Sequence, residues 1–354
     1  SPNIDCRQDG AKIGGARAGY LFNSSVAGID DADALLIIGS NPRLEAAVLN
    51  ARIRRNWLHS RMPVGVVGPK SELTYDADFL GDDPALLEAI ATGKHKFSAK
   101  LKKASRPMII IGMGALTRKD GGAMLAKARQ IAETYGVVTA DWNGFNVLHN
   151  AAARVGGLDL GFTPGRGGMD IAAMGKASQA GKLDVIWLLG VDEIDFTPFE
   201  NSFVIYQGHH GDAGAHHADL VLPGAAYTEK DGIYVNTEGR VQYASRAAFP
   251  PGDAREDWSI IRAVSGAVGK SIGLDTLVEL RGALCAEFPH FAKADQIMPA
   301  KWVNFGSRAK LSSVPVTTAL DNFYMTCAIS RASETMAECR RAAEDDNPRA
   351  VAAE

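Results

Sequence analysis

Short apolar runs recur along the chain and are separated by longer stretches in which apolar residues return with a helical period. The runs have the length of strands and lack polar alternation, which is typical of strands buried on both faces. They lie at residues 34–38, 64–67, 108–111, 185–189, 203–206 and 220–222. Strands that alternate with helices predict an α/β fold with doubly wound, mainly parallel sheets.

Helix signals fill the intervals between these runs. Ser40-Asn41-Pro42 predicts a helix start, because Asn caps free N–H groups and Pro fits the first turn; this helix should reach about Trp57. Further helices are predicted at 83–103 with an interruption at Gly93, at 122–135, at 171–180 and after Asp257. We also predict a short strand at 137–140, and irregular structure from 156 to 168.

This order of elements predicts two α/β lobes, residues 1–105 and 106–257, the second of which includes a Gly-rich segment at 208–242. A helical segment, 258–311, and a C-terminal docking tail, 312–354, should follow. The tail is mildly amphipathic, so we expect it to dock on a partner or on the body of the same chain. The opening Ser-Pro-Asn lacks both an initiator Met and a targeting pattern, which indicates an internal start in a longer polypeptide.

Composition narrows the class of protein only a little. Among 354 residues, 46% are hydrophobic and 22% charged, which is ordinary for a globular protein. The net charge of −3 gives no reason to expect nucleic acid or an anionic membrane as the partner. No apolar run approaches the roughly 20 residues that cross a bilayer, so we expect no direct membrane insertion.

Four cysteines, Cys6, Cys285, Cys327 and Cys339, lie far apart and form no C-x-x-C pair. The spacing argues against a zinc ribbon or a cluster-binding ferredoxin motif within these residues. It also gives no disulfide framework, which favours a reducing compartment.

A concentration of metal-ligating residue types follows the run at 203–206. His and Asp side chains crowd into 11 residues: His209, His210, Asp212, His216, His217 and Asp219. A metal site or a hydrolase centre is one interpretation. The alternative is a polar loop between strands, which Gly211 and Gly214 favour because they provide neither helical nor hairpin spacing.

Two other segments invite a chemical interpretation. The turn Gly39-Ser40-Asn41 would point backbone N–H groups at a phosphate, and Gly112-Met113-Gly114 is a partial match to a nucleotide loop. Neither has G-x-G-x-x-G or a Walker lysine, so both are better explained as strand-to-helix turns.

Acid–base chemistry is conceivable for Glu229, Asp231, Glu238 and Arg240, but an acid beside Arg in an ordered loop is more often an ion pair. The sequence contains no G-x-S-x-G nucleophile motif. We therefore expect no catalytic, cofactor-binding or metal-binding residue in this chain.

The segment 208–242 carries a longer pattern, D-L-V-L-P-(x)5-E-(x)2-G-(x)3-N-(x)2-G-R, which starts at Asp219. Its Gly and small polar residues predict an ordered loop packed across the open end of a sheet. The pattern resembles the signature of the molybdopterin oxidoreductase superfamily, and it implies a formate-dehydrogenase-like fold with two lobes.

Other segments resemble one branch of that superfamily, the large iron–sulfur subunit of NADH:quinone oxidoreductase (respiratory complex I). They are Ala32-Asp33 through Ala46, Asn50 to Arg54, Tyr206 to Asp212, Asp321 to Met325 and Ser330 to Met336. The resemblance implies a non-catalytic scaffold within an enzyme that carries electrons from NADH toward quinone and translocates protons. It places the 2Fe-2S and 4Fe-4S clusters in a part of the subunit that precedes these residues.

The same resemblance implies partners and a location. The partners would be the other peripheral-arm subunits, including the module that binds NADH and flavin. The chain would lie at the cytoplasmic face of a bacterial inner membrane or the matrix face of the mitochondrial one.

The chain departs from the catalytic members of the superfamily at its start. In those relatives an Asn-x-Asp start is followed by a Cys, selenocysteine or Ser that binds molybdenum. Here Asn3-Ile4-Asp5 begins the stretch, but Gly10 to Ile13 supplies no thiol or hydroxyl. Asp9 is nearby, and Cys6 comes too early. This favours loss of the cofactor; the alternative is a fragment of a catalytic molybdopterin oxidoreductase such as a formate dehydrogenase.

Overall fold

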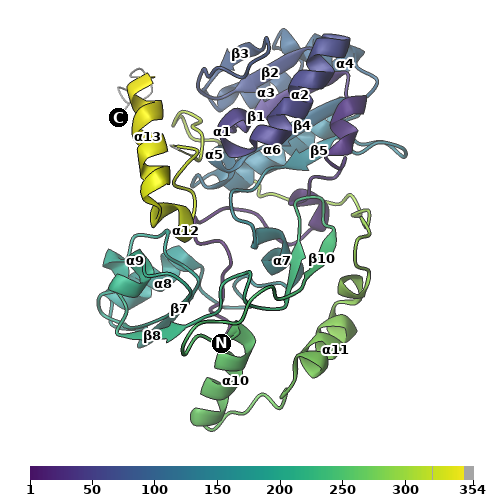
Figure 1. The fold of residues 1–354 in the computed structure, drawn as a ribbon. Coiled ribbons are helices and arrows are strands. Elements are labelled where there is room, and N and C mark those ends of the chain that lie inside the picture. Colours follow the sequence, from purple (N-terminus) through teal and green to yellow (C-terminus); the bar gives the residue numbers. More distant parts are fainter. Residues whose placement is uncertain (321, 347–354) are drawn as a thin grey trace.

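The first lobe is built on a five-stranded parallel sheet (Figure 1), seen in a computed structural model that describes residues 1–320 and 322–346. The strand order is β3-β2-β1-β4-β5. The strands are β1 Ala34–Ile38, β2 Val64–Val67, β3 Asp78–Gly81, β4 Pro107–Ile111 and β5 Phe145–Val147. Successive strands run outward on both sides of β1, so the order reverses between β1 and β4. The predicted doubly wound architecture is confirmed.

Both faces of this sheet are buried, because alternate side chains of each strand enter different layers. In β1, Leu35 and Ile37 join one apolar cluster, and Leu36 and Ile38 join the other. The first cluster is completed by α2 Ala47–Ser60, and the second by α3 Ala85–Ala91, α4 Phe97–Lys103 and α6 Gly121–Thr134. Each fully buried aliphatic side chain contributes about 1.5–3 kcal/mol, which explains the unbroken apolar runs in the sequence.

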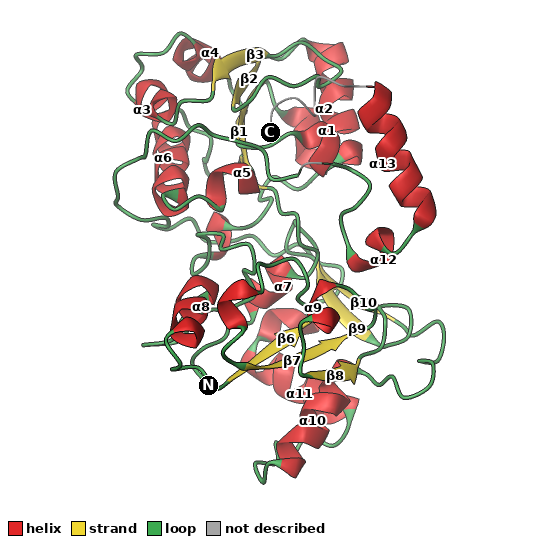
Figure 2. Cartoon of the chain, turned by 90° about the vertical axis from the view of Figure 1, so that its left-hand side faces the viewer, coloured by secondary structure: helices red, strands yellow, loops and turns green. Residues whose placement is uncertain are grey.

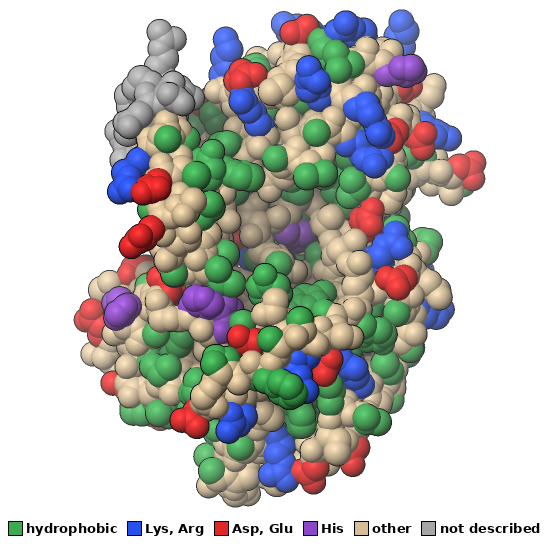
Figure 3. Space-filling model, in the orientation of Figure 1, with side chains coloured by type: hydrophobic (Ala, Val, Ile, Leu, Met, Phe, Trp, Pro, Cys, Tyr) green, Lys and Arg blue, Asp and Glu red, His purple; other side chains and the backbone are tan. Residues whose placement is uncertain are grey.

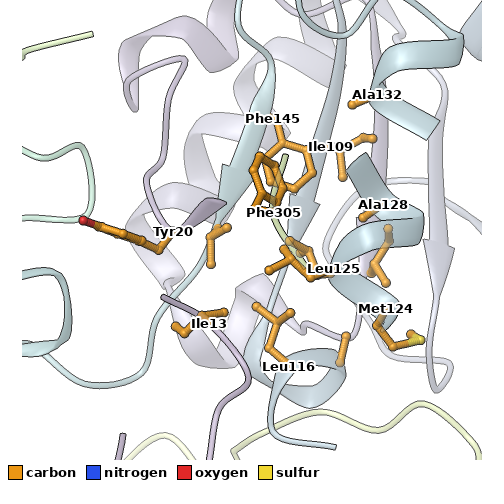
Figure 4. Close-up of a cluster of buried hydrophobic side chains, with 14 of the residues drawn as sticks. Ile13, Tyr20, Ile109, Leu116, Met124, Leu125, Ala128, Ala132, Phe145 and Phe305 are labelled. Carbon is orange, nitrogen blue, oxygen red and sulfur yellow. The ribbon is translucent and has the colours of Figure 1, made fainter. Parts of the chain in front are cut away.

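Figure 4 shows the cluster on the α6 side of the sheet. Phe145 of β5 meets Phe305, with ring centroids 5.3 Å apart, so a segment late in the chain returns to pack on the first lobe. Tyr20 borders the same cluster and directs its hydroxyl away from it. That hydroxyl reaches the junction described below.

The first lobe differs from the predictions in three places. The helix predicted at 42–57 is two helices, α1 Pro42–Glu45 and α2, divided at Ala46. Residues 137–140 form no strand, since Thr139 N–H closes a turn on Trp142 O, and the strand β5 begins only after Gly144. The edge strand β3 was not predicted, because its residues are only partly buried and carry little apolar signal. The predicted interruption at Gly93, between α3 and α4, is confirmed.

The predicted boundary at residue 105 requires correction. β1 pairs along its whole length with β4, and β4 pairs with β5, so strands on both sides of residue 105 belong to one sheet. The first sheet therefore extends to Val147. A run of apolar strands does not show which sheet each strand joins, and that is why the sequence placed the boundary too early.

The second lobe contains a three-stranded parallel sheet, β6-β7-β8, visible in the lower part of Figure 2. Its strands are β6 Val185–Leu189, β7 Phe203–Gly208 and β8 Leu220–Pro223. One face packs on α8 Ile171–Gln179, the 3₁₀ turn η3 Thr197–Phe199 and α9 Ala213–His216. The segment predicted to be irregular from 156 starts inside a helix, α7 Arg154–Asp159, and continues as loop.

The signature segment is more regular than predicted. Residues 232–244 form an antiparallel hairpin of β9 Gly232–Val235 and β10 Val241–Ala244. The alternation of Ile233, Tyr234 and Val235 is a strand pattern, which the surrounding Gly and polar residues obscured. The turn of the hairpin lies at the carboxyl end of β5, where Thr237 Oγ1 donates to Val147 O at 3.5 Å.

The rest of the chain wraps around both lobes. α10 Asp257–Ala267 and α11 Leu277–Glu287 contain no fully buried residue, and Figure 1 shows both at the periphery of the molecule. After η4 Pro289–Ala292 the chain returns to the first lobe, and the last described elements are α12 Ala328–Arg331 and α13 Glu334–Asp346. The remaining 3₁₀ turns and the short α5 are η1 Arg17–Gly19, η2 Ala27–Asp31 and α5 Met113–Leu116. Asp321 and residues 347–354 of the predicted tail lie outside the described residues.

Candidate functional site: the junction between the lobes

A buried carboxylate, Asp159 at the end of α7, lies at the centre of the junction between the lobes. Its side chain is 1% exposed. Arg17 of η1 donates to it from Nε at 2.9 Å and from Nη2 at 3.0 Å, and Tyr20 Oη donates at 2.8 Å. His290 of η4 lies 3.2 Å away through Nε2. The carboxylate of Asp159 therefore connects α7 to residues 17–20 and to η4, each more than 100 positions away in the sequence.

Arg17 extends the network to two further segments. Its Nη1 donates to Met298 O at 3.1 Å, and its Nη2 donates to Gly239 O at 2.9 Å. Burial, with the neighbouring charge of Asp159 next in importance, raises the pKa of Tyr20 well above its usual range. The phenol therefore stays protonated and acts as a hydrogen-bond donor, which suits a structural role.

The turn of the signature hairpin is fixed by its own polar residues. Asn236 Oδ1 accepts from Glu238 N and Arg240 N, each at 3.0 Å. Glu238 Oε1 accepts from Val26 N at 2.7 Å, and Glu238 Oε2 lies 3.7 Å from Arg240 Nε. Glu238 and Arg240 thus form the predicted ion pair.

Gly239 is required at this turn for two reasons. Its φ of +79° lies in the left-handed region, and a Cβ at this position would come within 2.7 Å of Arg17 Nη2. The glycine thus lets the hairpin approach the buried arginine. The other two acidic candidates are backbone acceptors: Glu229 binds Ala226 N and Asp231 binds Arg246 N.

The turn Gly39-Ser40-Asn41, which we interpreted as a strand-to-helix turn, lies at the topological switch point and connects β1 to α1. Its polar groups have partners within the chain. Glu45 Oε1 accepts from Asn41 N and Glu45 Oε2 accepts from Ser40 Oγ, both at 2.8 Å. Burial raises the pKa of Glu45, against the opposing effect of these bonds and of one from the backbone of Ala319. The backbone N–H of Asn41 and the hydroxyl of Ser40 therefore already have an acceptor within the chain.

A late segment of the chain closes the same region. Val316 is 1% exposed, and its N–H donates to Asp82 O at 2.7 Å. The carbonyl of Thr317 lies so close to Gly114 that a Cβ there would collide with it. Arg118, paired with Asp120, donates to Pro315 O at 2.7 Å. Residues 312–319, which we name the strap, thus cover the loops that follow β1 and β4.

The six clustered His and Asp residues do not converge. His209 and His210 approach through their Nδ1 atoms at 2.6 Å, whereas His217 stacks on Phe196 and Asp219 accepts from Val204 N. Among the described residues, no group of three or more His, Cys, Asp or Glu side chains could hold a metal ion. The segment is not a simple loop, since α9 contains Gly214 and His216 and is capped by Asp212; the prediction that Gly211 and Gly214 exclude helical spacing was wrong.

Asp212 from that cluster has a different partner, Arg331 of α12. Arg331 contacts three carboxylates on the second lobe, from Nε to Asp212 at 2.7 Å, from Nη1 to Glu193 at 2.8 Å and from Nη2 to Asp192 at 3.2 Å. Burial alone would raise the pKa of Asp212, but the hydrogen bonds from Arg331 and Ala213 lower it. The tail thus docks on the body of the same chain, one of the two alternatives that the sequence left open.

The opening segment does not offer a ligand for molybdenum. Asp5, the last residue of the Asn-x-Asp start, is paired with Arg7 at 2.7 Å, and Arg7 Nη1 donates to Ile13 O at 2.9 Å. Ala11 and Ile13 are buried in the apolar core. Cys6 lies against Gly157, and burial raises its pKa, so it is a thiol and not a thiolate. These residues do not fit the thiol or hydroxyl ligand that binds molybdenum in the catalytic pattern.

Two further groups near the junction, the partly buried His149 and the buried Arg154, were not predicted. His149 Nε2 bonds Tyr20 O at 2.6 Å, and burial lowers its pKa to about 4. Arg154 of α7 pairs with Asp9 at 2.9 Å.

Figure 3 shows that the surface is hollowed between the two lobes. Nothing in the sequence distinguished Arg17, Asp159 or Arg154 from ordinary surface charges, because their partners are distant in the chain.

The sheet order and the signature hairpin together define the class of protein. Residues 1–267 match the family Molybdopterin oxidoreductase, and the chain belongs to that family. A second match covers residues 296–339, which include the strap and most of the tail. It is to the C-terminal region of the G subunit of NADH-ubiquinone oxidoreductase.

Curated relatives of this chain are also named as parts of NADH-quinone or NADH-ubiquinone oxidoreductase. The G subunit of NADH-quinone oxidoreductase from Rickettsia felis is 44% identical over 95% of this chain and 48% of its own length. NADH dehydrogenase [ubiquinone] iron-sulfur protein 1, mitochondrial, of Solanum tuberosum is 41% identical over 96% of this chain and 45% of its own. The chain therefore spans about half the length of the curated relatives it matches.

The fold is shared with an enzyme of known structure. Acetylene hydratase from Pelobacter acetylenicus superposes with a TM-score of 0.50 at 13% identity, over 74% of this chain and 53% of that one. At this identity the likeness concerns the fold alone. Within the part of the chain that the structure describes, no helix is long and apolar enough to cross a bilayer.

Proposed function

We propose that this chain is a non-catalytic scaffold part of the large iron–sulfur subunit of respiratory complex I. That enzyme carries electrons from NADH toward quinone and translocates protons. The observation that carries the proposal is the internal occupation of the ligand positions: Glu45 and the strap fill the switch point. The relatives named as parts of NADH-quinone oxidoreductase support the same assignment, and they do not support a formate dehydrogenase fragment.

The clusters and the partners follow from this proposal. The 2Fe-2S and 4Fe-4S clusters would be bound by polypeptide that precedes these residues in the whole subunit. The partners would be other peripheral-arm subunits, including the module that binds NADH and flavin. The location would be the cytoplasmic face of a bacterial inner membrane, or the matrix face in mitochondria.

A scaffold serves electron transfer by holding its shape. Cluster potentials depend on hydrogen bonding and solvent exposure, and a neighbouring body that shifted would change both. Here the lobes are joined by Asp159 at the junction and by Arg331 through the tail. Asp159 and Arg331 each make several charge-assisted hydrogen bonds, which fix geometry more tightly than a single hydrogen bond does.

Metal and pterin analysis of the purified chain tests the non-catalytic part. We expect less than about one tenth of an equivalent of molybdenum or tungsten, and no pterin released by acid, with a formate dehydrogenase prepared in parallel as the positive control. A stoichiometric metal with a pterin would contradict the proposal and favour a catalytic molybdopterin oxidoreductase.

Assembly in the native host tests the complex I part. Arg331→Ala should leave Asp192, Glu193 and Asp212 without their shared cation and release the tail from the second lobe. We expect a several-fold lower amount of assembled peripheral arm on native gels stained for NADH oxidation. Lys310→Ala, at an exposed position, is the matched control. Normal assembly in a host that lacks the whole chain would contradict the proposed role.

A further inference from the structure

Charge is unevenly distributed along this chain, although its net charge is only −3. Between Glu88 and Asp120 there is no Asp or Glu. The same stretch contains eight basic residues: Lys94, Lys96, Lys100, Lys102, Lys103, Arg106, Arg118 and Lys119. Surfaces that mix the two signs avoid large fields of one sign, and this stretch does not mix them.

Six of these residues lie on or beside α4 and are exposed. We name them the basic surface: Lys94, Lys96, Lys100, Lys102, Lys103 and Arg106. Phe97, Ser98 and Leu101 of α4 are buried and fix the inner side of the helix, so the lysines lie on its outer side. Figure 3 shows Lys and Arg side chains gathered over the first lobe, in the upper part of the view.

Only part of this charge is neutralised within the chain. Lys100 pairs with Asp78, and Arg106 pairs with Asp31. A third acid nearby, Asp33, accepts from the backbone N–H groups of Ser105 and Arg106. The other four cations have no ion-pair partner among the described residues; they are Lys94, Lys96, Lys102 and Lys103.

Helix formation explains only some of these lysines. Lys102 and Lys103 lie in the last turn of α4, where cations complement the helix dipole. Lys94 and Lys96 lie at the opposite end, where the dipole favours acids, and the first turn of α4 contains no acid. Lys96 and Lys100 also repel each other at the i, i+4 spacing. The excess charge therefore disfavours the helix in the isolated chain, and carboxylates from a partner would remove that cost.

The composition of the basic surface favours protein carboxylates over other anions. Five of its six cations are Lys, whereas Arg is the better residue for recognising phosphate groups. The ring of Phe97 is buried, so it offers no platform on which a nucleic-acid base could stack. No large hydrophobic side chain between Leu58 and Leu160 is exposed, so none beside the lysines would enter a lipid bilayer.

A second copy of this chain is a less suitable occupant. The second lobe offers an acidic stretch, since between Lys182 and Lys230 there are eight Asp or Glu and no Lys or Arg. A contact between this stretch and the basic surface of another copy would be head-to-tail, which produces a ring or an open filament. A different protein with an acidic surface would neutralise the lysines without propagating further.

We propose that the basic surface is the docking site for an acidic surface of a different protein, whose carboxylates pair with the four unpaired lysines. Complementary charge of this kind speeds the encounter and fixes the orientation of the partner. The acidic stretch of the second lobe repels a partner that approaches that lobe with its acidic surface first. This inference goes beyond the scaffold role and does not rest on it, because it assigns the charge of the occupant in any assembly that contains the chain.

Carbodiimide cross-linking in gently lysed cells of the native host tests the proposal, because this reagent joins a Lys amine only to a carboxylate in direct contact. We expect mass spectrometry to find Lys102 or Lys103 of the full gene product joined to an Asp or Glu of another polypeptide. The cross-link should be lost when salt is raised from about 0.1 M to about 1 M, since salt screens exposed charges. The pair Lys230 and Asp257 within the chain is the internal control for the reaction.

Charge reversal tests the same contact without the reagent. In Lys102→Glu combined with Lys103→Glu, the amount of cross-linked partner that copurifies should fall at least about tenfold, because like charges then face each other. Neither residue is buried, so the urea midpoint should not change. Lys301→Glu combined with Lys310→Glu, both exposed, is the matched control and should retain the partner. Replacing the cross-linked acid of the partner by Lys should restore binding to the Glu variant.

Several outcomes would overturn the proposal. One is a cross-link between Lys230 and Asp257 with none from the basic surface to another polypeptide. Cross-links from the basic surface to residues 183–229 of another copy would identify self-association as the contact. Loss of the partner after nuclease or detergent treatment would assign the surface to nucleic acid or to a lipid membrane. Full copurification of the cross-linked partner with the Glu variant would show that the lysines do not hold it. The cross-linking result is obtained on the unsubstituted protein, so it decides the proposal even if the Glu variant does not fold.

Discussion

Replacing Asp159 by Asn removes the charge at the centre of the junction and keeps the shape of the side chain. Arg17, which is 20% exposed, would remain with a buried charge and no counter-ion. Breaking a buried pair by removing one partner costs about 3–5 kcal/mol. Arg17 would retain its bonds to the carbonyls of Met298 and Gly239, so we expect a loss of unfolding free energy near the lower end, about 3 kcal/mol.

Urea unfolding followed by circular dichroism measures this loss as a lower midpoint at an unchanged slope. The matched control is Asp31→Asn, because Asp31 pairs with Arg106 at 3.3 Å on the surface, with more than half of its side chain exposed. Exposed pairs contribute about 0–1 kcal/mol, so the control should change little. Hydrogen exchange should accelerate in residues 17–26 and 236–240 of Asp159→Asn, since both segments depend on Arg17.

Equal unfolding free energies for Asp159→Asn and the control Asp31→Asn would refute this reasoning. A second variant separates charge from packing: Arg17→Met combined with Asp159→Leu removes both charges and should recover most of the lost free energy, because apolar pairs often replace buried ion pairs without cost. If the double variant were less stable than Asp159→Asn alone, the bonds of Arg17 to the carbonyls would be the dominant contribution.

Three further predictions concern single sites. Gly239→Ala should lower stability by about 1–3 kcal/mol in urea unfolding, and more than Gly136→Ala, which has a similar φ but open space around it. Gly114→Ala should displace the strap and increase proteolysis within 312–319, whereas Gly156→Ala, with its nearest neighbour at 3.6 Å, should not. Burial lowers the pKa of His149 to about 4, so as the pH falls the unfolded state binds a proton at a higher pH than the folded state does. The unfolding free energy should therefore fall by about 2–3 kcal/mol between pH 6.5 and pH 4. Urea unfolding at the two pH values measures this fall, and His149→Gln should reduce it.

The sequence predicted elements whose cause is local. The five apolar residues of β1 are all buried at the centre of the sheet, and Asn41 caps α1 with Pro42 in its first turn. The interruption at Gly93 is equally local, since its φ of +76° suits Gly. These predictions needed only neighbouring residues, and they are confirmed.

The junction could not be predicted for the opposite reason. Asp159 and Arg17 are 142 positions apart, and each alone is an ordinary charged residue. The pairing of β1 with β4 likewise depends on tertiary topology, which placed the end of the first sheet at Val147 and not at 105. The sequence singled out Arg331 only as part of the segment Ser330 to Met336, which resembles the complex I branch. Of its three carboxylate partners, Asp212 was considered as a metal ligand, and Asp192 and Glu193 gave no signal.

The proposed scaffold role requires that the crevice at the switch point be stable without a bound ligand. At a switch point, free backbone N–H groups in a dry crevice cost several kcal/mol unless something accepts from them. In this chain Glu45 accepts from Asn41, and the strap brings Val316 into the core below it. The same polypeptide continues to Arg331 on the second lobe, so the tail joins the lobes at a high effective concentration. Under the proposed scaffold role, Glu45 and the strap would take the place of a ligand in the crevice, and the ion pairs of Arg331 would hold the two lobes together.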